Sequence, residues 1–455
     1  MRIIIVGAGK TAEVLIQHLE KSGHDIIIVD KNKNIVENIT DHYSVNGVCG
    51  SGASREVLLS AGADTADVII SLTPVDEINL LACSMAKSLG TRYAAAEVER
   101  KELICDEAYL KEKFGINYIL TPKNLVSAAI AYQIFFNSAN RVEPFLDSRV
   151  LLAEITVKKD SFLANAMLKD LKPRLESDFL VFGVLRKDDL IIPRGDFVLQ
   201  PGDAIGLIAD KSEMTKLFSK VDLVRKPVHS VMLIGGGELG SAVAERLLEH
   251  HISVKLVENN RDRCETLLAD YPKAKIVYGN GTDVELLEEE KIGKYDACVC
   301  TTGNDETNLL ASLIAWTSGV NNIVTRINTA SYDRVLRKVT INITVSPDRI
   351  MAEKLLDYLW SLQVGSAGEE TSRYYSMGAS MLKISEFDIP VGFQRAELPL
   401  MSEEMRLKKG VIIGAVERDG AIIIPRGNDV IHCGDRIIVL SESQLELLSP
   451  NDLFL

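Results

Sequence analysis

Short runs of apolar residues alternate with longer amphipathic stretches through the first 140 residues of the chain. Strands are predicted at residues 3–6, 26–29, 68–71 and 118–120, and helices at residues 12–21 and 78–88. A regular alternation of apolar strands and amphipathic helices indicates βαβ units around a parallel sheet. We therefore expect an α/β domain at residues 1–140.

The pattern changes after residue 140. Strands are predicted at residues 149–157, 180–185, 190–192 and 204–208, with polar turns at 187–189 and 201–203. Short strands joined by tight turns indicate a small strand-rich α+β domain, which we place at residues 141–222.

The second half of the chain repeats the landmarks of the first half at a nearly constant offset. Gly7 and Asp30 correspond to Gly235 and Glu258 at an offset of 228 residues, and the Ile-Pro-Arg-Gly segment at 192–195 recurs at 424–427. Landmarks that match in the same order indicate an internal duplication. The expected fold class is therefore α/β, with two Rossmann-like parallel-sheet domains, each followed by a small strand-rich α+β domain. The second pair is expected at residues 228–365 and 373–455, with linkers at 221–228 and 364–372.

A glycine-rich loop follows the first predicted strand. Its residues are Gly7, Ala8, Gly9, Lys10, Thr11 and Ala12. In a Rossmann fold the first glycine permits a tight turn, the second lets a pyrophosphate approach the backbone, and a small residue at the end packs helix on strand. The helix N-terminus then faces the phosphates. Asp30 ends the second strand, where a carboxylate can hold ribose hydroxyls, and Lys31 follows it in the predicted site.

The same motif recurs in the second copy, with Glu258 as the distal acid. Its residues are Gly235, Gly236, Gly237, Glu238, Leu239 and Gly240. A carboxylate at the ribose position repels a 2′-phosphate, so NAD(H) or an unmodified adenosine is favoured over NADP(H). The segment at residues 9–11 resembles the end of a P-loop, but Ile4 occupies the position at which that motif requires glycine.

Two further pairs of segments lie at predicted strand ends, where α/β proteins bind ligands. They comprise Gly50-Ser51-Gly52 with Gly279-Asn280-Gly281, and Thr73, Asp76 and Asn79 with Thr302, Asp305 and Asn308. The glycines either let a ligand approach the backbone or form a turn. The polar residues either contact a ligand or cap a helix, because acidic residues suit a helix N-terminus.

Composition narrows the class of function. The chain has 455 residues and a formal net charge of −13, which makes nucleic acid an unfavourable partner. No apolar run reaches the roughly 18–20 residues that cross a bilayer. The sequence contains no nucleophile elbow, no His-Glu-x-x-His motif and no metal-ligand spacing. We therefore expect no catalytic residues and no metal, and a nucleotide sensor rather than an enzyme.

Taken together, these motifs resemble the TrkA-type regulatory subunits of Trk potassium-uptake systems, which contain tandem RCK (KTN) domains. The resemblance covers essentially the full chain, and it also includes Arg326 before Ser346-Pro347 and the repeated Gly-Asp segments. It implies a cytoplasmic homo-oligomer, usually a tetramer, peripheral on the inner face of the cell membrane beneath an integral membrane Trk-type potassium channel subunit. It also implies that NAD(H), ATP or ADP binds the crevices and biases channel opening.

The two copies differ at the end of the fifth strand. The second copy has Arg326, which suits a nucleotide phosphate, whereas the first copy has Glu97. A carboxylate beside a phosphate is unfavourable, so we expect weaker phosphate binding in the first copy unless Lys10 compensates. Two other functions remain open from the sequence: an NAD-dependent oxidoreductase, and an RCK-type regulator of a different cation transporter.

Overall fold

A computed structural model describes most of the chain. The described residues are 1–20, 23–104, 106–136, 139–145, 149–187, 189–221, 228–329, 332, 343–363, 372–377, 380–442, 445, 447 and 449–455. The interiors of both expected linkers, residues 222–227 and 364–371, lie outside these residues. Within the described residues, no helix is both long enough and apolar enough to span a membrane.

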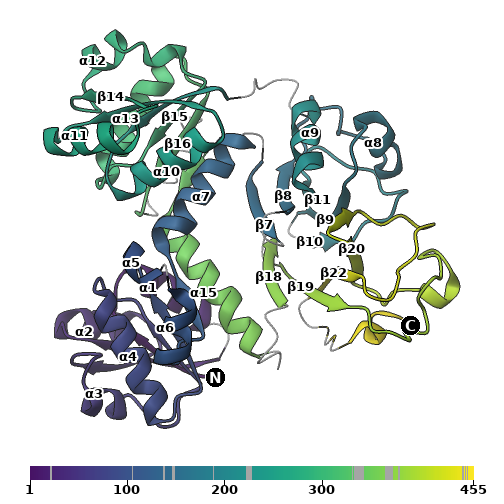
Figure 1. Cartoon of the computed structure of the whole chain (residues 1–455), viewed down its shortest axis with the longest axis horizontal. Helices are drawn as coiled ribbons and strands as arrows, with labels where there is room; N and C mark the ends of the chain where they lie inside the picture. Colours follow the sequence, from purple (N-terminus) through teal and green to yellow (C-terminus); the bar gives the residue numbers. More distant parts are fainter. Residues whose placement is uncertain are drawn as a thin grey trace. The chain divides into compact units, whose positions relative to one another are not determined.

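The first sheet has six parallel strands in the order β3-β2-β1-β4-β5-β6. Figure 1 shows this domain at the N-terminal end of the chain, in purple and dark blue. The strands are β1 (Arg2–Val6), β2 (Asp25–Asp30), β3 (Asn46–Cys49), β4 (Val68–Ser71), β5 (Tyr93–Glu97) and β6 (Tyr118–Leu120). The helices are α1 (Lys10–Leu19), α2 (Lys33–His42), α3 (Arg55–Ser60), α4 (Asp76–Leu89), α5 (Lys101–Ile104), α6 (Glu107–Phe114) and α7 (Pro122–Phe135). All four strands predicted for this region are confirmed. The apolar pattern did not predict β3 because most of its residues are exposed at the sheet edge.

The second sheet repeats this order position by position, as β14-β13-β12-β15-β16-β17. Its strands are β12 (Ser230–Ile234), β13 (Ser253–Glu258), β14 (Lys275–Tyr278), β15 (Ala297–Cys300), β16 (Asn322–Arg326) and β17 (Ile343–Val345). The helices include α10 (Glu238–Glu249), α11 (Arg261–Asp270), α12 (Val284–Glu289), α13 (Asp305–Thr317) and α15 (Pro347–Gln363). The strand order reverses direction beside β1 and beside β12, which places a crevice at the carboxyl ends of the strands in each copy.

Each strand-rich domain is a five-stranded sheet with antiparallel pairing. The first has the order β10-β9-β11-β8-β7, with β7 (Arg141–Phe145), β8 (Val150–Thr156), β9 (Leu180–Arg186), β10 (Asp189–Ile191) and β11 (Ala204–Asp210). The second has the same topology, with β18 (Ser372–Met377), β19 (Ser380–Asp388), β20 (Val411–Arg418), β21 (Ala421–Ile423) and β22 (Arg436–Glu442). Helices α8 (Leu168–Leu175) and α9 (Lys211–Val221) accompany the first sheet. The expected fold class is confirmed.

The Gly-Asp turns of the strand-rich domains have a structural role. Asp203 accepts two hydrogen bonds from Arg186, one from Nε at 2.8 Å and one from a terminal nitrogen at 2.7 Å. Asp435 and Arg418 repeat this bidentate pair at the same two distances. Each carboxylate is buried and thereby joins a strand end to the turn before the next strand.

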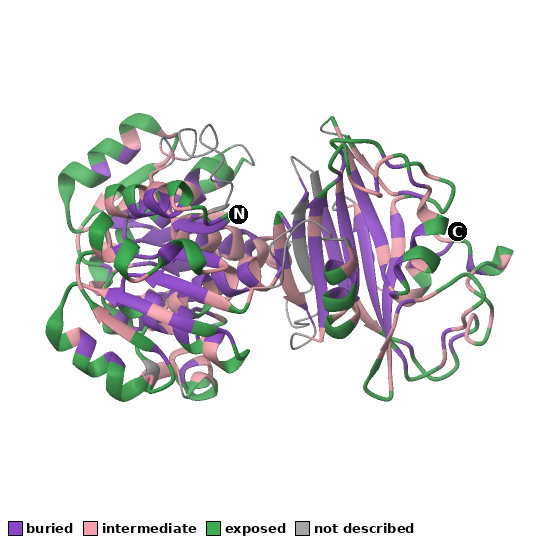
Figure 2. Ribbon diagram, turned by 90° about the horizontal axis from the view of Figure 1, so that it is seen from above, coloured by how far each residue is buried: buried purple, intermediate pink, exposed green. Residues whose placement is uncertain are grey.

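The chain divides into two compact units that do not follow the order of the sequence. One unit combines Met1–Ala128 with Met232–Leu359, and the other combines Ala129–Val231 with Trp360–Leu455. The first unit therefore holds both parallel sheets and the second holds both strand-rich sheets. Figure 2 shows buried strands between more exposed helices in the parallel-sheet domains, as expected for sheets covered on both faces.

The core of the second unit is shared by the two strand-rich domains. Phe182 of the first domain meets Tyr375 of the second edge to face, with ring centroids 5.6 Å apart, and both side chains are fully buried. Leu152 and Ile438 belong to the same apolar cluster. Burial of large side chains from both copies stabilises their association, at roughly 1.5–3 kcal/mol for each one removed from water.

Candidate nucleotide-binding sites

The first glycine-rich loop leaves β1 in a conformation that requires glycine. Gly7 has φ +93°, and a Cβ at this position would lie 2.8 Å from the carbonyl oxygen of Leu72. The backbone N–H of Gly7 donates to the carbonyl of Val29 at 2.8 Å, and that of Ala8 donates to Oδ2 of Asp30 at 2.9 Å. The distal acid predicted from the sequence therefore holds the loop itself, and its other oxygen accepts from the backbone N–H of Asn32 at 2.8 Å.

The second loop has the same construction. Gly235 has φ +101°, and the backbone N–H of Gly236 donates to Oε2 of Glu258 at 2.7 Å. A Cβ on Gly240 would lie 1.9 Å from the carbonyl oxygen of Gly235, so this turn accepts no larger residue. One residue that the motif did not predict also holds the loop, because Nε of Arg263 donates to the Gly236 carbonyl at 2.9 Å.

Helices α1 and α10 both begin next to these loops without a capping side chain. Their N-cap residues are Gly9 and Gly237, and neither makes a side-chain cap hydrogen bond. An added Cβ at either glycine would meet no atom of the described part of the chain within 4 Å. The first N–H groups of each helix are therefore available to an anion, in the arrangement that phosphate-binding loops use.

The polar residues at the end of β4 position the backbone. Asn79 is fully buried, and its Oδ1 accepts from the N–H and hydroxyl of Thr73 at 2.8 and 2.7 Å while its Nδ2 donates to the carbonyl of Glu97 at 2.9 Å. Asp76 accepts from the N–H of Arg100 at 2.9 Å. These side chains join the ends of two neighbouring strands, so they shape the wall of the first crevice.

The second copy repeats this arrangement. Asn308 accepts from the N–H of Thr302 at 2.8 Å and donates to the carbonyl of Arg326 at 3.0 Å, and Asp305 accepts from the N–H of Thr329 at 2.9 Å. The helix-cap alternative is wrong for both threonines, because α4 is preceded by Val75 and α13 is capped by the side chain of Asn304. Each threonine hydroxyl bonds its asparagine instead.

The glycines after the third strand of each copy lie against the first strand. A Cβ on Gly52 would lie 2.2 Å from Cγ1 of Val6, and one on Gly281 would lie 2.2 Å from Cγ2 of Ile234. These two glycines therefore let their own backbone pack closely against a side chain of the first strand of each sheet. Ser51 is exposed beside it in the first copy, and Asn280 lines the crevice in the second.

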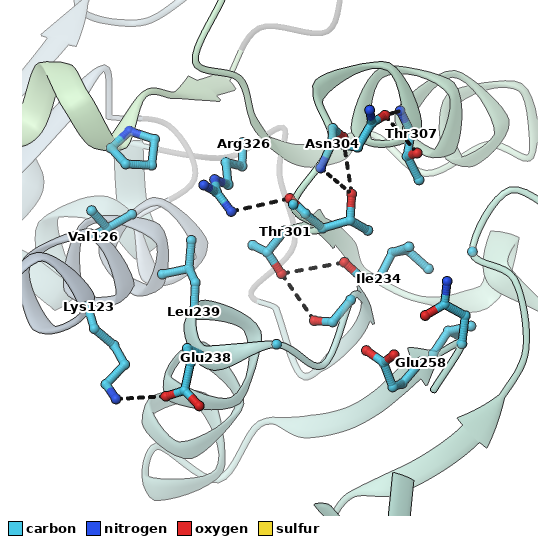
Figure 3. Close-up of a pocket in the computed structure, with 18 of the residues that line it drawn as sticks. Lys123, Val126, Ile234, Glu238, Leu239, Glu258, Thr301, Asn304, Thr307 and Arg326 are labelled. Atoms are coloured by element: carbon cyan, nitrogen blue, oxygen red, sulfur yellow. Dashed lines mark hydrogen bonds and ion pairs between the residues drawn. The ribbon is translucent and has the colours of Figure 1, made fainter. Parts of the chain in front are cut away.

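A pocket of about 630 Å³ lies in the crevice of the second copy (Figure 3). This volume suits a nucleotide-sized ligand. The predicted site residues in its wall are Gly235, Gly237, Glu238, Leu239, Glu258, Asn280, Gly281, Thr302 and Arg326. The predicted residues Gly236, Gly240 and Asp305 do not line it.

The first half of the chain closes one side of this pocket, which the sequence did not reveal. The contributing residues are Glu99, Pro122, Lys123 and Val126, the last three from the start of α7. The repeated segments Thr121-Pro122 and Ser346-Pro347 indicate that this helix start occurs in both copies. A sequence motif does not show which crevice the helix start contacts.

Arg326 brings a cation to the floor of the pocket. One terminal nitrogen donates to the carbonyl of Thr302 at 3.3 Å (Figure 3), while its buried Nε has no hydrogen-bond partner among the residues that the structure describes. A buried donor without a partner is costly unless a ligand satisfies it. The guanidinium is therefore suited to bind a phosphate.

Glu97 occupies the equivalent position in the first copy and has the opposite character. Burial, together with the charges of Glu99, Asp76 and Asp348, raises the pKa of the Glu97 carboxyl to about 8. At neutral pH this carboxyl is mainly protonated, and above pH 8 it adds a buried negative charge. Lys10 lies exposed at the start of α1.

In the described ranges, no group of three or more His, Cys, Asp or Glu side chains is arranged to hold a metal ion. The buried thiols of Cys298 and Cys300 lie 3.9 Å apart on β15, where burial and the neighbouring thiol raise the pKa of Cys298. They face the core of the second parallel-sheet domain, away from the pocket lining.

The duplicated fold and its paired crevices define a tandem protein of Rossmann and strand-rich domains. The TrkA-N domain model matches residues 3–122 and 231–347, and the TrkA-C domain model matches residues 152–222 and 402–448. The chain therefore belongs to the TrkA family of RCK-type proteins.

Relatives match along almost the whole chain. The Trk system potassium uptake protein TrkA homolog of Archaeoglobus fulgidus is 30% identical over 97% of this chain and 97% of its own length. The Trk system potassium uptake protein TrkA of Haemophilus influenzae is 28% identical over 96% of this chain and 95% of its own length.

Solved structures show the same fold. The GsuK channel aligns with a TM-score of 0.67 at 21% identity, covering 97% of this chain and 77% of the channel chain. The GsuK channel bound to NAD aligns with a TM-score of 0.65 over the same shares at 21% identity.

Proposed function

We propose that this protein is a nucleotide-sensing regulatory subunit of a membrane potassium-uptake system. The observation that carries the proposal is the pocket of the second copy, which is lined by a glycine-rich loop, by the distal acid Glu258 and by Arg326. Family membership and the names of the relatives, which are potassium uptake proteins, support the transport role.

The ligand in each crevice is NAD(H), with ATP or ADP as further ligands. Asp30 and Glu258 disfavour a 2′-phosphate, and the uncapped helix starts accept the pyrophosphate. The proposed contacts in the first crevice are Gly7, Ala8, Gly9, Lys10, Thr11, Ala12, Asp30, Lys31, Gly50 and Ser51, with Thr73, Asp76 and Asn79 shaping its wall. Those in the second are Gly235, Gly236, Gly237, Glu238, Leu239, Gly240, Glu258, Asn280, Gly281, Thr302 and Arg326, with Asp305 behind them.

The protein acts as a cytoplasmic homo-oligomer, a tetramer, docked peripherally on the inner face of the cell membrane. Its partner is an integral membrane Trk-type potassium channel subunit, and it carries out no catalysis itself. The functional domains in this proposal are residues 1–140, 141–222, 228–365 and 373–455. Exchange of one nucleotide for another would shift the population of subunit shapes and so bias channel opening.

Isothermal titration of the full chain with NADH, ADP and adenosine tests the ligand. The Arg326→Gln variant should weaken ADP binding by about tenfold at the second crevice, because a charge-assisted hydrogen bond to phosphate is lost. Arg261→Gln, at an exposed position on α11, is the matched control and should bind ADP like the wild type. Absence of nucleotide binding would reject the sensor function.

Two further measurements separate the alternatives. Purification from membranes, followed by identification of the retained integral protein, distinguishes a potassium channel subunit from a different cation transporter. Assay of NADH oxidation with a broad substrate panel tests the oxidoreductase alternative, and sustained turnover would contradict a purely regulatory role.

A further inference from the structure

The two crevices carry opposite charges at the first residue of the helix that follows the glycine-rich loop. Lys10 begins α1 in the first copy, and the equivalent residue at the start of α10 is Glu238. The charges are reversed at the start of the helix that the other half of the chain contributes to each crevice. The second crevice receives Lys123 from α7, and the equivalent residue at the start of α15 is Asp348.

In the second crevice these two residues form an ion pair. Nζ of Lys123 lies 2.9 Å from Oε2 of Glu238, as Figure 3 shows at the start of α10. The Lys123 side chain is only 19% exposed and lines the pocket, whereas Glu238 is 75% exposed. A terminal nitrogen of Arg263 lies 3.9 Å from the other oxygen of Glu238. The carboxylate is therefore set between two cations beside the uncapped helix N-terminus.

In the first crevice the contact across the two halves is of a different kind. The hydroxyl of Thr11 donates to Oδ1 of Asp348 at 2.8 Å, so the residue contributed by the other half is an acid. The lysine of this entrance, Lys10, belongs to the same domain as the glycine-rich loop. A phosphate in the first crevice would therefore contact Lys10, which lies in the same domain as the glycine-rich loop. A phosphate in the second crevice would contact Lys123, which lies in the other half of the chain.

We propose that Lys123 binds the phosphate of a nucleotide in the second crevice from the opposite half of the chain, and that Glu238 holds Lys123 in place until the phosphate arrives. This inference rests on the proposed nucleotide-binding function. A phosphate at the start of α10 carries more charge than the carboxylate of Glu238 and therefore competes with that carboxylate for Lys123. Phosphate in this crevice then acts directly on the first turn of α7.

The consequence is a functional asymmetry between two crevices of common origin. Residues 123–128 of α7 belong to the unit that contains the pocket, and residues 129–135 of the same helix belong to the other unit. Charge at the second crevice therefore acts at the start of an element that connects the two units along the chain. In the first crevice the position of α15 equivalent to Lys123 holds Asp348, an acid.

Hydrogen exchange of the full chain with ADP or adenosine as the probe tests this inference site by site. Peptides covering residues 235–241 report ligand in the second crevice, those covering 7–13 report the first, and those covering 121–128 report the start of α7. The wild type should show protection at 235–241 and a changed exchange rate at 121–128 with ADP, and a smaller change at 121–128 with adenosine.

Three variants give different expected results. Lys123→Met should raise the ADP concentration for half-protection of 235–241 by about tenfold and leave that for adenosine unchanged. Glu238→Gln should lower the ADP concentration several-fold because the competing carboxylate is gone. The double variant Lys123→Glu/Glu238→Lys restores an ion pair with the lysine on the loop side, so ADP should still bind. The phosphate would then repel the acid on α7, so the change in exchange at 121–128 should be opposite in sign to that of the wild type.

The outcomes separate this inference from the function on which it rests. Equal loss of ADP and adenosine binding in Lys123→Met would overturn the inference, since it would show that the side chain only shapes the pocket. A change at 121–128 of the same sign as in the wild type in the double variant would also overturn it. If neither ligand protects 235–241 in the wild type, the proposed function fails as well, and circular dichroism of each variant establishes that it is folded.

Discussion

Replacement of Glu97 by glutamine should make the folded chain less sensitive to alkaline pH. Burial and the nearby charges of Glu99, Asp76 and Asp348 raise the pKa of the Glu97 carboxyl from 4.5 to about 8. Between these two values the folded chain keeps a proton that the unfolded chain has released. The free energy of unfolding therefore falls as the pH rises through this window.

The size of the effect follows from the two pKa values. Each unit of difference corresponds to about 1.4 kcal/mol, so this carboxyl accounts for a loss on the order of 3 kcal/mol between pH 6 and pH 9. Glutamine preserves the shape of the side chain and carries no charge at either pH. The Glu97→Gln variant should therefore lose that part of the pH dependence and gain most over the wild type at pH 9.

Urea unfolding at pH 6, 7.5 and 9 measures the difference. Glu56→Gln is the matched control, because Glu56 is an exposed carboxyl on α3 of the same domain and its replacement should leave the pH profile unchanged. Parallel profiles for Glu97→Gln and the wild type would refute the reasoning, because they would show that Glu97 ionises similarly in the folded and unfolded chains.

Three further substitutions test other parts of the structure. Gly240→Ala should abolish ADP binding in the second crevice, because its Cβ would lie 1.9 Å from a loop carbonyl oxygen; titration calorimetry measures this, and Gly195→Ala, where the nearest atom is 3.6 Å away, is the control. Asn79→Ala should lower the free energy of unfolding in urea by about 2–4 kcal/mol, because it leaves several buried groups without partners; a loss below about 0.5 kcal/mol would contradict the strand-joining role. Although burial acts in the opposite direction, the hydrogen bonds from Arg186 and from a backbone N–H hold the pKa of Asp203 below 3.8. The stability that this pair provides is present above pH 3.8 and is lost as the pH falls through the lowered value, so Asp203→Asn should be less stable than the wild type at pH 7 and should show a smaller further loss on acidification.

Much of the architecture could be predicted because local pattern and burial agree. Parallel strands such as β1 and β4 are buried on both faces, so they appear as continuous apolar runs. The glycine-rich loops were found because a tight turn and a helix start impose particular residues at particular spacings. Strand β3 was missed, since an exposed edge strand needs no apolar run.

The candidate site was only partly predictable. The glycines and distal acids of both loops lie where the motif placed them, and Arg326 faces the pocket. Asn79 was predicted as a ligand contact or as part of a helix cap, whereas its amide joins β4 to β5. A polar residue at a strand end satisfies either role, and only the positions of its neighbours distinguish them.

By itself, the sequence determined the duplication, the four sheets and the two glycine-rich loops. These features depend on periodicity and steric demands within about thirty residues of chain. Only the tertiary structure decided that like domains of the two copies associate, so that Lys123 of the first half completes a crevice of the second. The physical reason is that the hydrophobic effect is not directional: the residues of an apolar face show that the face will be buried, but they do not specify which surface will cover it.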